Sequence, residues 1–230
     1  MTDLAVFIMG AGRMGEILAA SMAKSHRVVL YDRDGGKGRQ AAERAGCRFS
    51  PPEEALMGAG AVILALPPAV TVSALAAISS YIIPETVVIN IATTVFKDDL
   101  RPALEGRPHL VGAKIVGHYR EMGSKPAILV DADTEKGGEV AGELFSGLGQ
   151  VERGDERLVG LINTTATREA FRAAATIEKI LREEGVGPAL IKSALGVVAA
   201  GSVKSYAEGD IGPFGRKLVE EIKAAQTSHK

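Results

Sequence analysis

The hydrophobic positions of this chain form short continuous runs in its first two thirds, separated by segments with helical spacing. Four runs have the length of a strand, at residues 4–9, 28–31, 61–66 and 86–91. Shorter or weaker runs at 48–49, 110–117, 127–130 and 150–151 predict further strands. Continuous apolar runs are typical of parallel strands buried on both faces. Their alternation with helices predicts an α/β fold, a doubly wound parallel sheet.

The pattern changes near Asp155, after which the strand signals end. Apolar residues recur at helical spacing from Leu158 to Leu181, Pro188 begins a second helix, and residues 218–222 belong to a third. We therefore predict an α/β domain at residues 1–153 and an all-α domain at residues 154–230. So short a helical segment buries too little surface to close a core of its own. It should pack against a second copy and form a homodimer, the alternative being that it folds back on the first domain.

A glycine-rich turn follows the first apolar run and carries the main chemical signal of the chain. Its residues are Gly10, Ala11, Gly12, Arg13, Met14 and Gly15. In a GxGxxG turn the glycines allow a tight bend, a close approach of backbone to a diphosphate, and close packing of helix on strand. The diphosphate then sits at the positive end of the following helix. The turn predicts a dinucleotide site in a Rossmann-type sheet, whereas a tight turn in an ordinary βαβ unit is the alternative.

Asp32 follows the second apolar run, about twenty residues after the turn, where a carboxylate accepts hydrogen bonds from a ribose diol. The alternative is a solvated residue at the end of a strand. Asp32 favours NAD because it repels a 2′-phosphate, but the neighbouring Arg33 could bind that phosphate. The choice between NAD and NADP therefore stays open. The nicotinamide half of the cofactor should pass Leu66 and Pro67, at the end of the run at 61–66.

Composition limits the other functions. The chain has 230 residues and a net charge of −1, with 27 basic and 28 acidic residues interspersed, so it lacks the basic patch that nucleic acids or membrane surfaces need. The single Cys47 excludes an intramolecular disulfide and a cysteine metal cluster. No histidine has partners at metal-ligand spacing. The N-terminal apolar run is too short for a membrane span, so we expect a cytoplasmic protein with a small-molecule substrate and no metal.

Several segments resemble the pyrroline-5-carboxylate reductase superfamily, and the N-terminal half also resembles deazaflavin-dependent NADP reductases. The resemblance is carried by residues 10–15, 63–67, 88–92, 144–149 and 177–186. It implies a nicotinamide-dependent reductase with a helical dimerisation region. Members that make proline carry a threonine and a Ser-Gly-Ser-Gly-Pro loop that holds the imino acid. This chain has residues 163–169 there, so Thr164 or Thr165 could offer a hydroxyl and Arg168 could bind a carboxylate, but proline synthesis is not expected. The alternative is that the threonines only bond to the backbone of their own helix.

A second likeness, limited to two loops, is to the prephenate dehydrogenases. Thr93-Thr94-Val95 and Gly117-His118 occupy the places of that family's Gly-Ser-Val and Gly-His-Pro. The resemblance implies that His118 is the acid/base and that Thr93 or Thr94 assists it, and a histidine suits this role because its pKa lies near neutrality. The alternative is an ordinary loop histidine. Lys114 and Arg120 could steer a substrate carboxylate, or could simply be solvated charges.

Together these features predict an NAD(P)-dependent oxidoreductase. It would transfer hydride between the nicotinamide and a small imine, carbonyl or hydroxy acid, with the protein orienting the cofactor and supplying a proton. The alternative is a non-catalytic nucleotide-binding protein, a sensor or assembly module, on the same fold.

Overall fold

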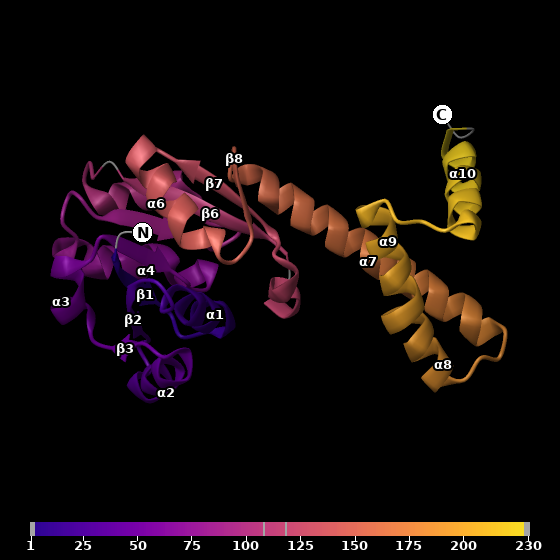
Figure 1. Ribbon diagram of the computed structural model, residues 1–230, viewed down its shortest axis with the longest axis horizontal. Coiled ribbons are helices and arrows are strands. Elements are labelled where there is room, and N and C mark those ends of the chain that lie inside the picture. The colour runs from indigo at the N-terminus through magenta and orange to yellow at the C-terminus, as the bar shows by residue number, and fades with distance from the viewer. Residues whose placement is uncertain (1–2, 108, 118, 228–230) are drawn as a thin grey trace. The chain divides into compact units, whose positions relative to one another are not determined.

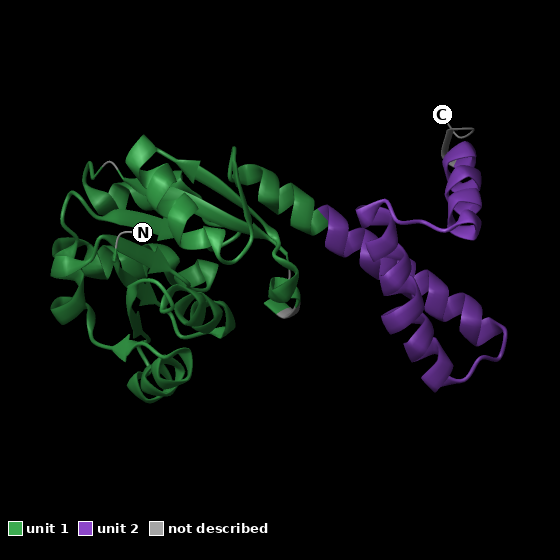
Figure 2. Cartoon of the chain, viewed as in Figure 1, with its two compact units in different colours: residues 1–164 green, residues 165–230 purple. Residues whose placement is uncertain are grey.

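The computed structural model describes residues 3–107, 109–117 and 119–227. The chain divides into two compact units, Met1–Thr164 and Thr165–Lys230 (Figure 2). The division falls inside a long helix, whereas the last strand of the sheet ends at Arg153. The domain boundary after residue 153 stays a prediction.

The first unit is built on an eight-stranded sheet (Figure 1). Its strands lie side by side in the order β3-β2-β1-β4-β5-β6-β7-β8. The strands are β1 (Ala5–Met9), β2 (Arg27–Tyr31), β3 (Arg48–Phe49), β4 (Ala61–Leu64), β5 (Val87–Asn90), β6 (Leu110–Val116), β7 (Ala127–Ala132) and β8 (Gln150–Arg153). Each strand predicted from an apolar run is present, which confirms the Rossmann-type α/β fold.

One strand departs from the predicted parallel arrangement. β7 runs antiparallel to β6, with Gly112 opposite Asp131, whereas the other neighbouring pairs are parallel. The physical reason is the connection, residues 117–126, whose described part contains one 3-10 segment, Tyr119–Ser124, and no α-helix. A parallel neighbour requires a crossover of about a dozen or more residues, usually a helix.

Helices cover both faces of the sheet. α1 (Arg13–Met22), α2 (Gly35–Ala45) and α6 (Glu135–Ser146) pack on one face, through residues such as Leu18, Ala41 and Phe145. α4 (Pro68–Ile78) and α5 (Lys97–Leu100) pack on the other, through Leu75 and Leu100. The short helices between are α3 (Pro52–Ala55) and the 3-10 segments Leu56–Gly58, Ser79–Tyr81, Arg101–Leu104 and Tyr119–Ser124.

The start of α2 shows how local sequence sets an element. The glycine-rich residues 34–38 predict a flexible turn, but the helix already begins at Gly35. Asp34 caps it, because its carboxylate accepts hydrogen bonds from the amides of Gly36 and Lys37 at 3.0 and 3.1 Å. The helix ends at Gly46, which has a φ of 67° and serves as a left-handed cap.

The second unit is helical, as predicted. α7 (Arg157–Glu183) runs into it from the first unit, followed by α8 (Pro188–Ser193), α9 (Ala200–Glu208) and α10 (Pro213–Thr227). A π-helical turn, Ala194–Ala199, joins α8 to α9. Gly185, with a φ of 74°, ends α7 and Pro188 opens α8. Many large apolar side chains of this unit are exposed, including Phe171 at 72% and Phe214 at 78%.

Candidate dinucleotide site

The glycine turn connects β1 to α1 at the carboxyl edge of the sheet, and two of its glycines are required by packing. Gly10 has a φ of 110°, and its amide donates to the carbonyl oxygen of Tyr31 at 2.7 Å. A Cβ at Gly10 would collide with the carbonyl oxygen of Ala65, and one at Gly15 with that of Gly10. These contacts hold the ends of β1, β2 and β4 and the start of α1 together.

Gly12 differs from the other two glycines. It is the N-cap of α1, in extended conformation, and a Cβ there would meet no heavy atom of the described residues within 4 Å. Arg13 and Met14 form the first turn of α1, whose amides lack partners within the helix. Free amides, a positive helix end and an absent side chain leave room for an anionic group such as a diphosphate.

Asp32 lies at the end of β2, beside this turn. Its Oδ2 accepts from the amide of Ala11 at 2.8 Å and from Nζ of Lys37 at 3.1 Å, and its Oδ1 accepts from the amide of Asp34 at 3.0 Å. Burial alone would raise the pKa of Asp32, but these hydrogen bonds outweigh it and lower the pKa below its ordinary value. A fixed, ionised acceptor therefore stands next to the glycine turn.

A cavity of about 560 Å³ adjoins these residues. Its lining includes Gly10, Asp32, Arg33 and Lys37, together with Leu66 and Pro67, which lead into α4. The structure thus brings five of the predicted contacts, at the ends of β1, β2 and β4, around one opening. The rest of the glycine turn, residues 11–15, is not among the residues that line it. Its place, outside the carboxyl ends of parallel strands, is where open α/β sheets bind ligands.

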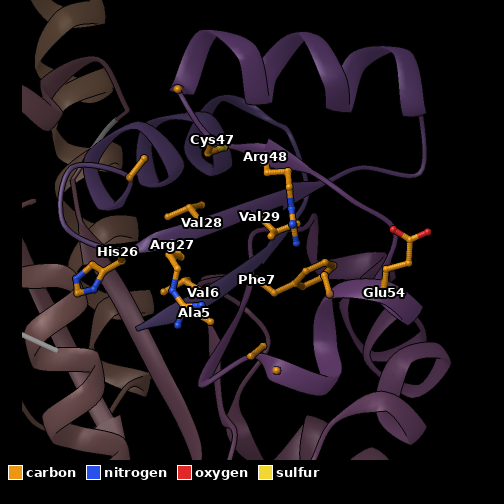
Figure 3. A pocket seen from close by; sticks show the side chains of 15 residues that line it. Ala5, Val6, Phe7, His26, Arg27, Val28, Val29, Cys47, Arg48 and Glu54 are labelled. Atoms are coloured by element: carbon orange, nitrogen blue, oxygen red, sulfur yellow. The ribbon is translucent and has the colours of Figure 1, made fainter. Parts of the chain in front are cut away.

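A larger cavity, of about 750 Å³, lies elsewhere on the sheet (Figure 3). Its walls include the first residues of β1 and β2, Ala5 and Arg27, together with Cys47, Arg48 and Glu54. It therefore opens toward the amino ends of these strands. The glycine turn and the start of α1 do not line it, and we do not assign the dinucleotide to it.

Thr93 and Thr94 lie in the turn that follows β5, and Thr93 is half-buried while Thr94 is exposed. Asn90, the last residue of β5, is buried and shapes this turn. Its side-chain amide donates to the carbonyl oxygen of Val95 at 2.7 Å, and its Oδ1 accepts from the amide of Ala92 at 3.0 Å. The predicted helper Thr93 therefore sits on a turn of fixed shape at the same edge of the sheet.

His118, the predicted acid/base, lies outside the described residues, as does the side chain of Arg120. The next residue, Tyr119, is described and contacts the glycine turn. The guanidinium of Arg13 lies over the Tyr119 ring, 4.6 Å from its centroid. The segment after β6 thus reaches the start of α1, a contact that the sequence pattern did not predict.

Thr164 is exposed on α7. It is far in sequence from Thr93 and the glycine turn, but the preceding residue, Asn163, is bonded to the sheet. Nδ2 of Asn163 donates to the carbonyl oxygen of Ile115, near the end of β6, at 3.2 Å. Residues 163–169 are helical throughout, so their amides are engaged in helical hydrogen bonds. They cannot form the backbone cradle that proline-synthesising relatives are expected to use.

Lys114 corrects the sequence analysis. It is neither a solvated charge nor a residue that reaches substrate, because its side chain is 0% exposed. Its Nζ lies 3.2 Å from Oε2 of Glu156, which is 2% exposed. Burial lowers the pKa of the Lys114 ammonium, against the opposing effect of the Glu156 carboxylate. The available signal was a lysine in the middle of an apolar strand, Leu110–Val116.

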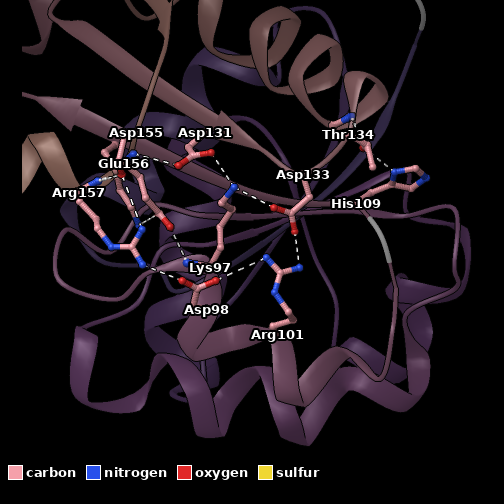
Figure 4. Close-up of polar contacts among 12 residues, drawn as sticks. Lys97, Asp98, Arg101, His109, Asp131, Asp133, Thr134, Asp155, Glu156 and Arg157 are labelled. Carbon is pink, nitrogen blue, oxygen red and sulfur yellow. Dashed lines mark hydrogen bonds and ion pairs between the residues drawn. The ribbon is translucent and has the colours of Figure 1, made fainter.

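Further charged residues join Glu156 in a network of hydrogen bonds and ion pairs (Figure 4). Lys97 lies between Asp131 and Asp133, with Nζ–oxygen distances of 2.6 and 2.8 Å. Arg101 also pairs with Asp133, at 2.7 Å. The network ties α5 to β7, so the segment after the Thr93 turn is held in place as well.

Residues 5–94 match an NADP oxidoreductase family. The matching family model is described as NADP oxidoreductase coenzyme F420-dependent, and the match includes the glycine turn, Asp32, Pro67 and Thr93. No curated protein sequence matches the chain significantly.

Solved structures share the fold over nearly the whole chain. A pyrroline-5-carboxylate reductase from Coxiella burnetii superposes with a TM-score of 0.76 at 15% identity, covering 99% of this chain and 92% of that chain. A pyrroline carboxylate reductase from Plasmodium falciparum, with NADP bound, gives 0.66 at 14% identity, covering 100% and 92%. A reductive aminase from Aspergillus terreus, in complex with NADPH and ethyl-5-oxohexanoate, gives 0.68 at 16% identity, covering 90% and 76%. The resemblance to the pyrroline-5-carboxylate reductase superfamily is confirmed at the level of the fold.

No helix within residues 3–107, 109–117 and 119–227 combines the length and the apolar character needed to cross a bilayer.

Proposed function

We propose that this chain is an NAD(P)-dependent oxidoreductase that transfers hydride between the nicotinamide and a small imine, carbonyl or hydroxy acid. The observation that carries the proposal is the open position of Gly12 at the start of α1, beside an Asp32 carboxylate held by the amide of Ala11. An adenosine ribose at Asp32 and a diphosphate at Gly12 would place the other half of the dinucleotide past Leu66 and Pro67.

The comparisons support this proposal independently of the geometry. The matching family is one of NADP oxidoreductases, and two of the similar structures hold NADP or NADPH. Both cofactors remain candidates for this chain, because Asp32 suits the free ribose diol of NAD and Arg33 lines the same cavity with a positive charge.

The bound cofactor would supply or accept the hydride, and the chain's own residues would handle the proton and the orientation of the substrate. We assign the acid/base role to His118 and the supporting hydroxyl to Thr93. Tyr119, next to His118, contacts Arg13 of the glycine turn, which supports a place for this segment at the cofactor site.

Substrate recognition is proposed for α7. Thr164 and Arg168 stand four residues apart and therefore share one face of the helix. Both are exposed. A hydroxyl and a guanidinium on one face suit a small substrate that carries a carboxylate beside a carbonyl or imine.

We also propose that the chain is a homodimer joined through its C-terminal helices. Phe171, Leu190, Val197 and Phe214 are each more than half exposed in the single chain. Such apolar surface is typical of helices that pack against a second copy. Light scattering at micromolar concentration should give twice the chain mass, and a monomer mass would reject the dimer.

The binding proposal is tested by titrating the purified protein with NADH and with NADPH and following nicotinamide fluorescence. We expect saturable binding of at least one cofactor, with a dissociation constant on the order of 1 μM to 1 mM, the usual range for enzyme ligands. The Gly12→Asp variant, which should fold but not bind, is the control. Absence of binding by the unaltered chain would reject the proposed function.

Catalysis requires a separate test, because a nucleotide-binding sensor would also pass the titration. Small imines and 2-oxo acids that accept hydride oxidise the reduced cofactor. This reaction is measured as the loss of the absorbance of the reduced nicotinamide. Binding without turnover of any substrate in a broad set would favour the non-catalytic alternative.

A further inference from the structure

Lys114 is a charged residue that is fully buried within the sheet. It lies on β6, where its neighbours Ala113 and Ile115 are buried, and its own side chain is fully buried. Burying a charge costs several kcal/mol unless it is paired and fully hydrogen-bonded. A methionine of similar size would fill this space without that cost. The contacts of the ammonium should therefore indicate which part of the structure the buried charge stabilises.

The ammonium binds the turn that follows β5. Nζ donates to the carbonyl oxygen of Ala92 at 2.6 Å and to that of Val95 at 2.7 Å, and it lies 3.4 Å from that of Asn90. These oxygens lie before and after Thr93 and Thr94. Lys114 therefore binds the backbone at both ends of the turn. The Asn90 side chain binds the same two residues, Ala92 and Val95.

Glu156 balances the charge of the ammonium as its ion-pair partner. Its Oε2 faces Lys114 at 3.2 Å, its Oε1 accepts from the amide of Lys97 at 2.6 Å, and its own amide donates to Asp131 at 3.1 Å. The carboxylate passes over Gly112, where any Cβ would collide with it. The pair thus joins the turn after β5 to the segment that leads into α7.

The position of this turn gives the pair a role in the proposed site. β1 lies between β2 and β4, and β5 follows β4, with Leu64 opposite Asn90. A dinucleotide with its adenosine at the end of β2 and its diphosphate at the end of β1 extends its nicotinamide half over the ends of β4 and β5. The turn from Ile91 to Val95 lies at the end of β5.

We propose that Lys114, paired with Glu156, is a positioning residue that holds the Ile91–Val95 turn in the shape that receives the nicotinamide half of the cofactor. The inference rests on the proposed function and adds to it a residue that touches neither cofactor nor substrate. On this inference, the pair is kept despite the free-energy cost of burying two charges because it fixes the geometry of the site.

The test separates the two halves of the cofactor. The double variant K114M/E156Q removes both charges, so that neither is left alone, and keeps an oxygen at position 156 for the amide of Lys97. Its affinities for NADPH and NADH are compared with those for 2′-phospho-ADP-ribose and ADP-ribose, which lack the nicotinamide. We expect binding of the complete cofactor to weaken about tenfold, equivalent to about 1.4 kcal/mol, and binding of the matching fragment to stay within about twofold.

Lys136→Met is the matched control. Lys136 also donates to a main-chain carbonyl, that of Glu85 at 2.8 Å, but Glu85 precedes β5 and lies at its other end. This variant should bind all four ligands as the unaltered chain does.

Each result bears on the inference. An equal loss for cofactor and fragment would show general damage and overturn it, and so would an unchanged affinity for the complete cofactor. If the double variant does not fold, Lys114→Arg keeps the buried charge but replaces the compact ammonium by a planar group, and the same comparison applies. Failure of the unaltered chain to bind any of the four ligands would instead reject the proposed function, and the inference with it.

Discussion

Oδ2 of Asp32 accepts a hydrogen bond of 2.8 Å from the backbone amide of Ala11, which joins the end of β2 to the glycine turn after β1. Lys37 and the amide of Asp34 occupy two further acceptor positions. An ionised carboxylate has about four such positions. One remains for a ribose hydroxyl, so Asp32 can hold the turn and a nucleoside at the same time.

Asp32→Asn tests this double role. The new amide group must place an NH₂ against either the Ala11 amide or the Asp34 amide, so one donor loses its acceptor. We expect the free energy of unfolding to fall by about 1–3 kcal/mol, the usual value for a lost hydrogen bond to a charged group, together with a weaker affinity for NADH. Urea unfolding and cofactor titration measure the two effects. Full stability in the variant would show that the contact with Ala11 does not hold the turn.

Gly12→Asp should abolish cofactor binding and leave the fold intact. The side chain enters open space at the N-cap of α1, where aspartate is a favoured residue, but its negative charge repels a diphosphate. Thermal unfolding should occur at the unaltered temperature or slightly above, while the fluorescence titration shows no binding. Gly12→Ala, which adds no charge, serves for comparison and should bind more tightly than Gly12→Asp.

Gly15→Ala should lower the stability of the fold, which Gly12→Asp should leave intact. Its Cβ would collide with the carbonyl oxygen of Gly10, a backbone atom that cannot move away without disturbing the turn. We expect a loss of stability of about 1–3 kcal/mol, as for other overpacked sites, in chemical denaturation. Gly142→Ala on α6 is the control, since a Cβ there meets none of the described atoms within 4 Å. It should be neutral or stabilising by roughly 0.5–1 kcal/mol.

Arg33 should decide part of the preference between the two cofactors. It is exposed, lines the cavity beside Asp32 and carries the charge that a 2′-phosphate would meet. Arg33→Ala is expected to weaken NADPH binding by about tenfold, the loss of one charge-assisted hydrogen bond, and to change NADH binding by less than about twofold. Arg39→Ala is the matched control, because the Arg39 guanidinium lies over the Phe49 ring. Equal losses for both cofactors would contradict the assignment.

The ion pairs of Asp133 predict that the folded protein loses stability at acidic pH. Burial alone would raise the pKa of Asp133, but Arg101 and Lys97 outweigh it and lower the pKa below its ordinary value. The native pKa is thus below the unfolded one, near 3.9 for aspartate. The stabilisation is present above that value and is lost as the pH falls through the native pKa.

Asp133→Asn should therefore be less stable than the unaltered chain at pH 7 and should lose less stability on acidification from about pH 5 to pH 2. Urea unfolding at several pH values measures both. Glu139→Gln, on the exposed side of α6, is the control and should follow the unaltered curve. A parallel pH dependence in Asp133→Asn and the unaltered chain would contradict the assignment to this carboxylate.

Much of the first unit could be predicted because its strands are continuous apolar runs and its turns are marked by glycine and proline. The Gly10 turn, Asp32 and Pro67 come together because parallel strands end at one edge, a rule that needs only the order of the elements. The direction of β7 was missed, although the ten residues between Val116 and Ala127 are too few for a crossover and carried that information.

The contacts that shape the site could not be predicted in the same way. Lys114 and Glu156 are 42 positions apart in the sequence and are brought together only by the folding of β6 against the segment before α7. The contact of Arg13 with Tyr119 likewise depends on the path of an irregular segment. Hydrophobic periodicity predicts which residues are buried, but it does not predict which buried charges contact one another.

The buried pair also limits how this sequence can change over time. Loss of Lys114 alone leaves the Glu156 carboxylate uncompensated in a dry interior, and loss of Glu156 alone does the same to the ammonium, each at a cost of about 3–5 kcal/mol. That is a large part of the stability of an ordinary domain. The two residues should therefore be inherited together, with a glycine at position 112 to admit the carboxylate. Among distant homologues, joint occurrence of these three residues would mark the lineage that shares this arrangement of the turn after β5.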